Sequence, residues 1–169
     1  LVGTAEQDGR LADLGRLVAR TAFFPGTAGR SSIKCVLPAV LARSESLRQR
    51  YGRPVYGTAA MPSRNFPPGW VWVREVEGGV RDPYALLDPL LPDAAEWRAV
   101  EAAEQEETGL AGFVANGGAA MVAYGELQSP DLGDAARRGR EAQLRRYCEL
   151  DTLAMVMVYE ALADWIGPG

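Results

Sequence analysis

The 169-residue sequence contains no histidine, one lysine and two cysteines. Without histidine the chain cannot build a Ser-His-Asp or Cys-His catalytic centre, a His-ligated zinc site or an imidazole pH switch. Cys35 and Cys148 are too few for a disulfide framework, and we expect both to be small buried thiols. Any chemistry must therefore use carboxylates, hydroxyls, phenols, arginine or these thiols.

Long apolar runs are also missing. The longest nearly uncharged stretch, 152–159, is far shorter than the ~20 apolar residues that cross a bilayer, so we expect no membrane span. A net charge of −4, with 47% hydrophobic and 24% charged residues, is typical of one soluble domain, and the scarcity of cysteine favours the cytoplasm. The first residue is Leu1, from which we expect a processed or fragmentary chain.

Apolar residues recur at helical spacing in several parts of the chain. The strongest helix prediction is the C-terminal stretch, because it contains no proline and only one glycine, and Gly167 ends it. Ser31 or Ser32 would cap a second helix by accepting a hydrogen bond from its first turn. The predicted helices cover about residues 11–18, 33–40, 119–127 and 135–166.

The middle of the chain has a different character. Seven prolines between residues 53 and 92 exclude a long helix there, and β-forming residues before a glycine turn predict a hairpin over 70–80 with Trp70 and Trp72 on one face. An acidic helix is expected through Glu107. We therefore interpret 44–115 as a Pro/Trp-rich and acidic insertion within one partial domain that spans 1–169.

Tyr147 and Asp151 are four positions apart in the predicted C-terminal helix, so the phenol and the carboxylate lie on one face. A helix-borne carboxylate beside a hydroxyl that can orient water is half of what metal-assisted phosphodiester hydrolysis requires; the other half is further carboxylates. The same spacing is also typical of a tyrosine that packs its ring while the aspartate faces solvent or caps a neighbour.

Over nearly its whole length the chain resembles the C-terminal portion of domain-of-unknown-function family 2779, an uncharacterised bacterial family. This family belongs to the ribonuclease H-like superfamily, together with the DEDD-type 3′–5′ exonucleases. Arg30 departs from the family pattern, where a serine is expected. The matching stretches are RLADL at 10–14, SIKCVLPA at 32–39, YGRPVY at 51–56, NF at 65–66, DPY at 82–84, GGAAM at 117–121 and YCELDTLAMVMVYEAL at 147–162.

The resemblance implies the C-terminal part of a ribonuclease H-like α/β domain, mostly α-helical in this chain with a small β-hairpin region. In the tyrosine variant of these exonucleases the third motif is Y-x-x-x-D on the last helix, which matches Tyr147 and Asp151. Asp151 would then ligate a catalytic Mg²⁺ or Mn²⁺, and Tyr147 would orient the attacking water. The first two acidic motifs are expected upstream, in another half of the domain, so the isolated chain should be inactive.

Other residues are weaker candidates. Asp13 could face a cleft or complement a helix start. Lys34, the single lysine, could bind phosphate near a helix start or lie on the surface. The tryptophans could stack bases or pack the hairpin. An arginine run suits nucleic-acid phosphates but is also typical of a solvated helix face; it comprises Arg137, Arg138, Arg140, Arg145 and Arg146.

Two functional hypotheses follow. In the first, the complete protein is a metal-dependent nuclease that acts on DNA or RNA, and this chain is its C-terminal part. In the second, the chain is a binding module that keeps the scaffold without catalysis and contacts nucleic acid or protein through the arginine run and the Pro- and Trp-rich middle. The net charge of −4 limits the overall electrostatic attraction for nucleic acid, whereas local arginine clustering opposes that limit.

Overall fold

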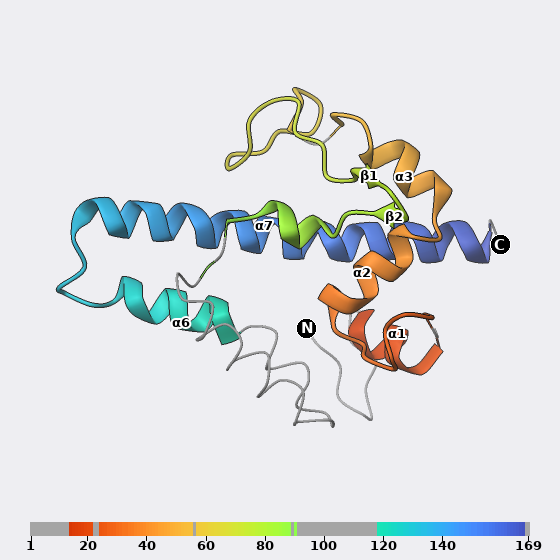
Figure 1. Ribbon diagram of the computed structural model, residues 1–169, viewed down its shortest axis with the longest axis horizontal. Coiled ribbons are helices and arrows are strands. Elements are labelled where there is room, and N and C mark those ends of the chain that lie inside the picture. Colours follow the sequence, from red (N-terminus) through yellow and green to blue (C-terminus); the bar gives the residue numbers. More distant parts are fainter. Residues whose placement is uncertain (1–13, 22–23, 56, 89, 91–117, 168–169) are drawn as a thin grey trace, which may run out of the picture.

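The computed structural model describes residues 14–21, 24–55, 57–88, 90 and 118–167, which are mostly helical with one two-stranded antiparallel hairpin. Figure 1 shows the order and the arrangement of these elements. Their bounds are α1 Leu14–Thr21, α2 Ile33–Leu41, α3 Glu45–Tyr51, β1 Glu75–Val76, β2 Gly79–Val80, the 3₁₀ helix η1 Pro83–Leu86, α6 Gly118–Leu127 and α7 Asp134–Ile166.

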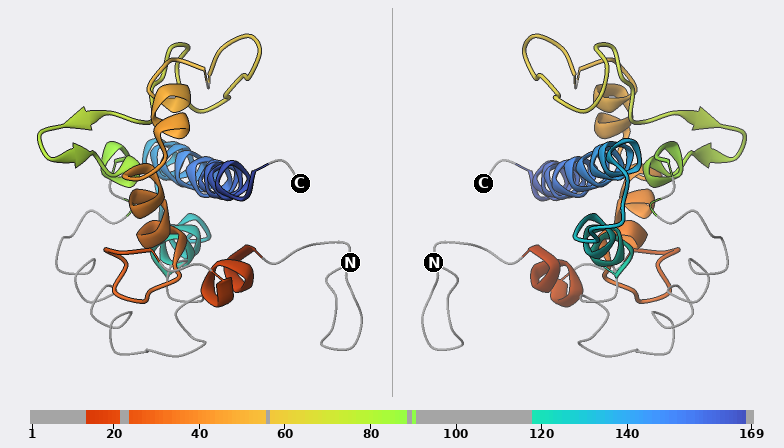
Figure 2. Two further views of the ribbon diagram at one scale, coloured as in Figure 1. Left: turned by 90° about the vertical axis from the view of Figure 1, so that its right-hand side faces the viewer. Right: turned by 90° about the vertical axis from the view of Figure 1, so that its left-hand side faces the viewer.

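Helix α7 is the element against which α2, α3 and α6 pack. Its 33 residues correspond to a length of about 50 Å at 1.5 Å per residue. The helix ends at Gly167, which has a φ of 77°, and this confirms the helix predicted over 135–166. Figure 2 looks along this helix: α3 and the following loop lie on one side of it, with α6 and α1 on the opposite side. The buried residues of α7 are Tyr147, Leu150, Leu153, Ala154, Met157, Val158 and Ala161.

Helices α2 and α3 supply the other half of the main core. In α2, Val36, Leu37, Val40 and Leu41 are buried despite the internal Pro38. Ser32 stands at the N-cap position, as one of the two predicted caps, but its side chain makes no cap hydrogen bond. Helix α3 was not predicted, although its start carries a recognisable signal: the buried Ser44 hydroxyl accepts a hydrogen bond from the Leu47 amide at 3.2 Å. Tyr51, in the last turn of α3, is also buried.

The predicted hairpin is shorter than expected. Only β1 and β2 pair, with Glu75 opposite Val80, whereas the residues from Trp70 to Val73 form no strand. The reason is that this segment packs inward instead of along a partner strand: Trp72 is 1% exposed, and the Val73 amide donates a hydrogen bond to the Tyr51 carbonyl at 3.0 Å. Trp72 lies in the core and Trp70 packs against it, which agrees with the prediction that the tryptophans serve in packing.

Two groups of buried side chains hold the described residues together. The larger joins α1, α2, α3 and the tryptophan segment to the C-terminal half of α7, so the described part of the expected 44–115 insertion is integral to the core. The smaller joins Leu90, Ala123 and Tyr147 between α6 and α7. Among the helices that the structure describes, none is both long and apolar enough to cross a membrane.

Two expectations concern residues outside the described part. The acidic helix through Glu107 and the role of Asp13 both lie there. Helix α6 matches the helix predicted over 119–127, and α1 begins at Leu14, within the helix predicted over 11–18. The four predicted helices are therefore all present in the described chain, whereas α3 and η1 were not predicted.

Candidate functional site

Tyr147 and Asp151 lie on one face of α7, as their spacing predicts, and a second tyrosine joins them. The Tyr84 hydroxyl donates a 2.6 Å hydrogen bond to Oδ1 of Asp151, and the Tyr84 and Tyr147 ring centroids are 6.1 Å apart. Tyr147 is 6% exposed, whereas Asp151 is half-buried. This geometry agrees with the interpretation in which Tyr147 packs its ring and Asp151 contacts a neighbouring residue.

Local sequence explains why Tyr84 points to α7. Asp82 accepts a hydrogen bond from the Tyr84 amide at 3.0 Å, and Pro83 occupies the first turn of η1. An acidic N-cap followed by proline is a helix-start signal, so the short helix was recognisable in the sequence. Its contact with a residue 67 positions further along the chain has no local signal.

Lys34 completes this group. Its Nζ atom lies 5.1 Å from the Tyr147 ring centroid and 5.9 Å from that of Tyr84, a distance at which an ammonium group is attracted to an aromatic ring. The structure thus brings the single lysine, on α2, to the two predicted catalytic residues on α7. We refer to Lys34, Tyr84, Tyr147 and Asp151 as the tyrosine cluster.

The cluster has perturbed acidities. Burial raises the pKa of Asp151 above its usual range, against the opposing effects of the Tyr84 hydrogen bond, the Lys34 charge and the Tyr147 hydrogen bond. Burial and the neighbouring Asp151 charge raise the pKa of Tyr84, so Tyr84 stays a hydrogen-bond donor. Partial desolvation, and then the charge of Asp151, also raise the pKa of the thiol of Cys148, although the residue as a whole is exposed.

The cluster does not match the ligand set of a divalent cation. Two metal ions need several oxygen ligands each, but Asp151 is the single carboxylate of the cluster and its partners are hydroxyl donors and an ammonium group. Within residues 14–21, 24–55, 57–88, 90 and 118–167, no three His, Cys, Asp or Glu side chains form a metal-binding group. The residues present do not fit Mg²⁺ or Mn²⁺ on their own.

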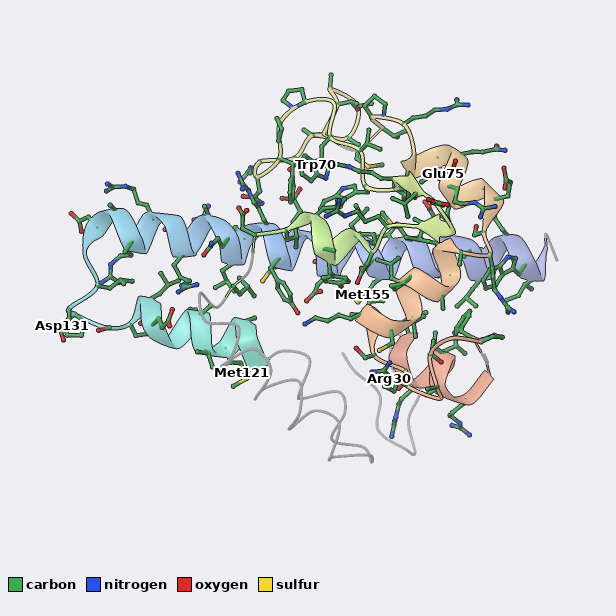
Figure 3. The ribbon with its side chains drawn as sticks, viewed as in Figure 1. Arg30, Trp70, Glu75, Met121, Asp131 and Met155 are labelled. Atoms are coloured by element: carbon green, nitrogen blue, oxygen red, sulfur yellow. The ribbon has the colours of Figure 1, made fainter. Side chains whose placement is uncertain are left out.

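A second site lies between the loop before Trp70 and the N-terminal half of α7. It is an open groove of about 400 Å³ that contains four arginines and one glutamate, and we call it the arginine groove. Figure 3 shows the loop of Trp70 on one side of α7 and Met121 of α6 on the other. The groove is lined by Arg64, Asn65, Arg138, Glu141, Ala142, Arg145 and Arg146.

The four arginines differ in their partners. Arg145 pairs with Glu141 at 2.5 Å within α7, and Arg146 contacts Asp88 at 3.4 Å and donates from Nε to the Asn65 carbonyl at 3.1 Å. Arg64 and Arg138 are exposed, and neither makes an ion pair or a side-chain hydrogen bond with another described residue. Two guanidinium groups from separate elements therefore remain to bind an anion.

The structure divides the predicted arginine run. Arg138, Arg145 and Arg146 line the groove, whereas Arg137 donates hydrogen bonds to the carbonyls of Leu127, Ser129 and Leu132 and so holds the α6–α7 connection. Arg140 likewise pairs with Glu126 of α6 at 2.8 Å. Sequence reasoning missed Arg64, because an isolated arginine between prolines has no helical pattern to mark it.

The groove and the tyrosine cluster occupy different faces of α7. Successive residues of an α-helix are rotated by about 100° around the helix axis. The side chain of Tyr147 is therefore rotated by about 200° from that of Arg145, two positions earlier. The predicted phosphate-binding and catalytic residues therefore do not converge, except for Lys34, which joins the cluster. The two sites are chemically separate in the described chain.

The remaining candidates have structural positions. Trp72 is buried, with the Trp70 and Phe66 ring centroids 5.6 and 4.7 Å away, so its ring is enclosed by the core. The expectation of buried thiols is wrong for Cys148, which is exposed, while Cys35 is half-buried. Cys148 follows Tyr147, and one step along the helix turns its side chain away from the core.

The chain was compared with models of protein families, with curated proteins and with solved structures, and none of them matches it.

Proposed function

We propose that this chain binds the phosphate backbone of nucleic acid through the arginine groove, as a non-catalytic module. The observation that carries the proposal is a pair of exposed arginines, Arg64 from the loop and Arg138 from α7, which line one groove and make no ion pair with another described residue. Arginine presents a planar set of donors that matches phosphate geometry. Phosphate therefore gains two charge-assisted contacts there without breaking an existing ion pair.

The shape of the groove favours a polymer over a small anion. The groove is open to solvent and, at about 400 Å³, is far larger than one inorganic phosphate. Arg145 and Arg146 of α7 add further positive charge to its lining. Their ion pairs with Glu141 and Asp88 involve exposed side chains and contribute little to stability. A polyanion can replace these carboxylates at small cost.

Salt-dependent binding tests the proposal. We expect the chain to bind a single-stranded oligonucleotide, measured by fluorescence anisotropy, with an affinity that falls between about 50 and 200 mM salt. Replacement of Arg64 and Arg138 by glutamine should reduce the slope of log K against log salt by about 1.4, or 0.7 for each lost contact. Arg20→Gln on α1 is the matched control. Equal slopes for the double variant and the control would reject the groove as the binding surface.

A second function concerns a longer protein. The side-by-side placement of Tyr147 and Asp151 on α7, next to Lys34, supports the proposal that such a protein is a ribonuclease H-like nuclease whose other carboxylates come from outside the described residues. In that protein Asp151→Asn should abolish Mg²⁺-dependent digestion of single-stranded DNA or RNA. Digestion that survives the substitution would remove Asp151 from the catalytic residues.

A further inference from the structure

Among the described residues, Asn65 is the one neutral polar side chain that lines the arginine groove, and contacts with the loop and with α7 hold it in place. Its Nδ2 donates a hydrogen bond to Oε2 of Glu149 on α7. Its backbone amide donates to the Ser63 hydroxyl at 3.1 Å, and its carbonyl accepts from Arg146. The amide group is therefore held in one orientation between the loop and α7.

This orientation determines what Asn65 can offer a ligand. Nδ2 donates one of its two hydrogens to Glu149, which places Oδ1 as the acceptor of the side chain, and no described group donates to Oδ1. Oδ1 is an acceptor, so a ligand must bring a hydroxyl or amine hydrogen. Glu149 acts through Asn65 and is a positioning residue.

We propose that the arginine groove binds RNA in preference to DNA because Oδ1 of Asn65 accepts a hydrogen bond from a ribose 2′-hydroxyl. This inference rests on the proposed function, since the arginines must first hold the backbone. Asn65 follows Arg64 in the chain, its backbone carbonyl accepts a hydrogen bond from Arg146, and all three residues line the groove. A sugar next to a phosphate held by these arginines would therefore be near the Asn65 side chain. A deoxyribose brings no hydrogen to this position.

Three oligonucleotides isolate the 2′-hydroxyl. Oligouridylate, oligodeoxyuridylate and 2′-O-methyl oligouridylate of equal length share a base without an exocyclic amine, and only the first carries a 2′-hydroxyl proton. The full chain should bind oligouridylate about 3- to 10-fold more tightly than the other two, which is the range expected for one net hydrogen bond. Because the 2′-O-methyl strand keeps the sugar oxygen without its proton, tight binding of that strand would overturn the proposal.

Variants of Asn65 and Glu149 complete the test. Asn65→Ala should bring the ratio of RNA to DNA affinity close to one. Glu149→Gln keeps an acceptor for Nδ2 and should preserve the ratio, whereas Glu149→Leu should lower it. Equal binding of all three oligonucleotides by the unsubstituted chain refutes the RNA preference but leaves the proposed function intact. Failure of all three to bind in a salt-dependent manner refutes the proposed function itself.

Discussion

Replacement of Tyr84 by phenylalanine removes one hydroxyl from the tyrosine cluster and creates no cavity. The lost contact is the 2.6 Å hydrogen bond to Asp151. A hydrogen bond to a charged group contributes about 1.5–3 kcal/mol to stability. Because Asp151 is half-buried and water can partly replace the phenol, we expect Tyr84→Phe to lower the free energy of unfolding by about 1.5–2 kcal/mol.

A double-mutant cycle measured by urea unfolding isolates this contact. In an Asp151→Asn background the amide oxygen accepts a neutral bond worth about 0.5–1.5 kcal/mol, so Tyr84→Phe should cost about 1 kcal/mol less than in the unsubstituted chain. The reasoning is refuted if Tyr84→Phe changes stability by less than about 0.5 kcal/mol in both backgrounds. Asp151 would then be a solvated carboxylate, available as a ligand.

Three further predictions concern stability. Burial raises the pKa of Asp151 above 3.8. The stability that the protonated form of Asp151 contributes is therefore lost as pH rises from about 4 through the folded pKa. Over this range, the stability of Asp151→Asn relative to the unsubstituted chain should increase in thermal melts. Leu150→Ala in the core should cost about 2–5 kcal/mol in urea, against less than about 0.5 for the exposed Ile166→Ala. Arg137→Ala leaves carbonyls at the end of α6 without its donors and should cost about 1–3 kcal/mol, with unchanged oligonucleotide binding by anisotropy.

Helices were predictable here because their signals are local. The absence of proline between Asp134 and Ile166, with glycine at 167, sufficed for α7, and the Tyr147–Asp151 pair followed from helical spacing alone. The hairpin was overestimated because β-forming residues such as Trp72 serve equally in a buried irregular segment. Pattern alone does not distinguish pairing with a strand from packing on α7.

The sites could be only half predicted from sequence. Arg138, Arg145 and Arg146 follow from the helical pattern, but their partners Arg64 and Asn65 come from a loop about 80 positions earlier and no local rule connects them. Tyr84 reaches Asp151 across a similar separation. The division of the arginine run, in which Arg137 holds a loop, depends on where α6 ends, and this too is a tertiary property.

The buried residues of α7 begin only at Tyr147 and extend to Ala161. Its first turns, 134–146, can therefore open without exposing the main core, whereas amides between 147 and 161 exchange with solvent deuterium only when the core unfolds. Arg138, Arg145 and Arg146 all belong to these first turns, whose amides we expect to exchange faster. A polyanion in the groove should slow amide exchange over 134–146 and leave the slow amides unchanged, which maps the binding surface one residue at a time.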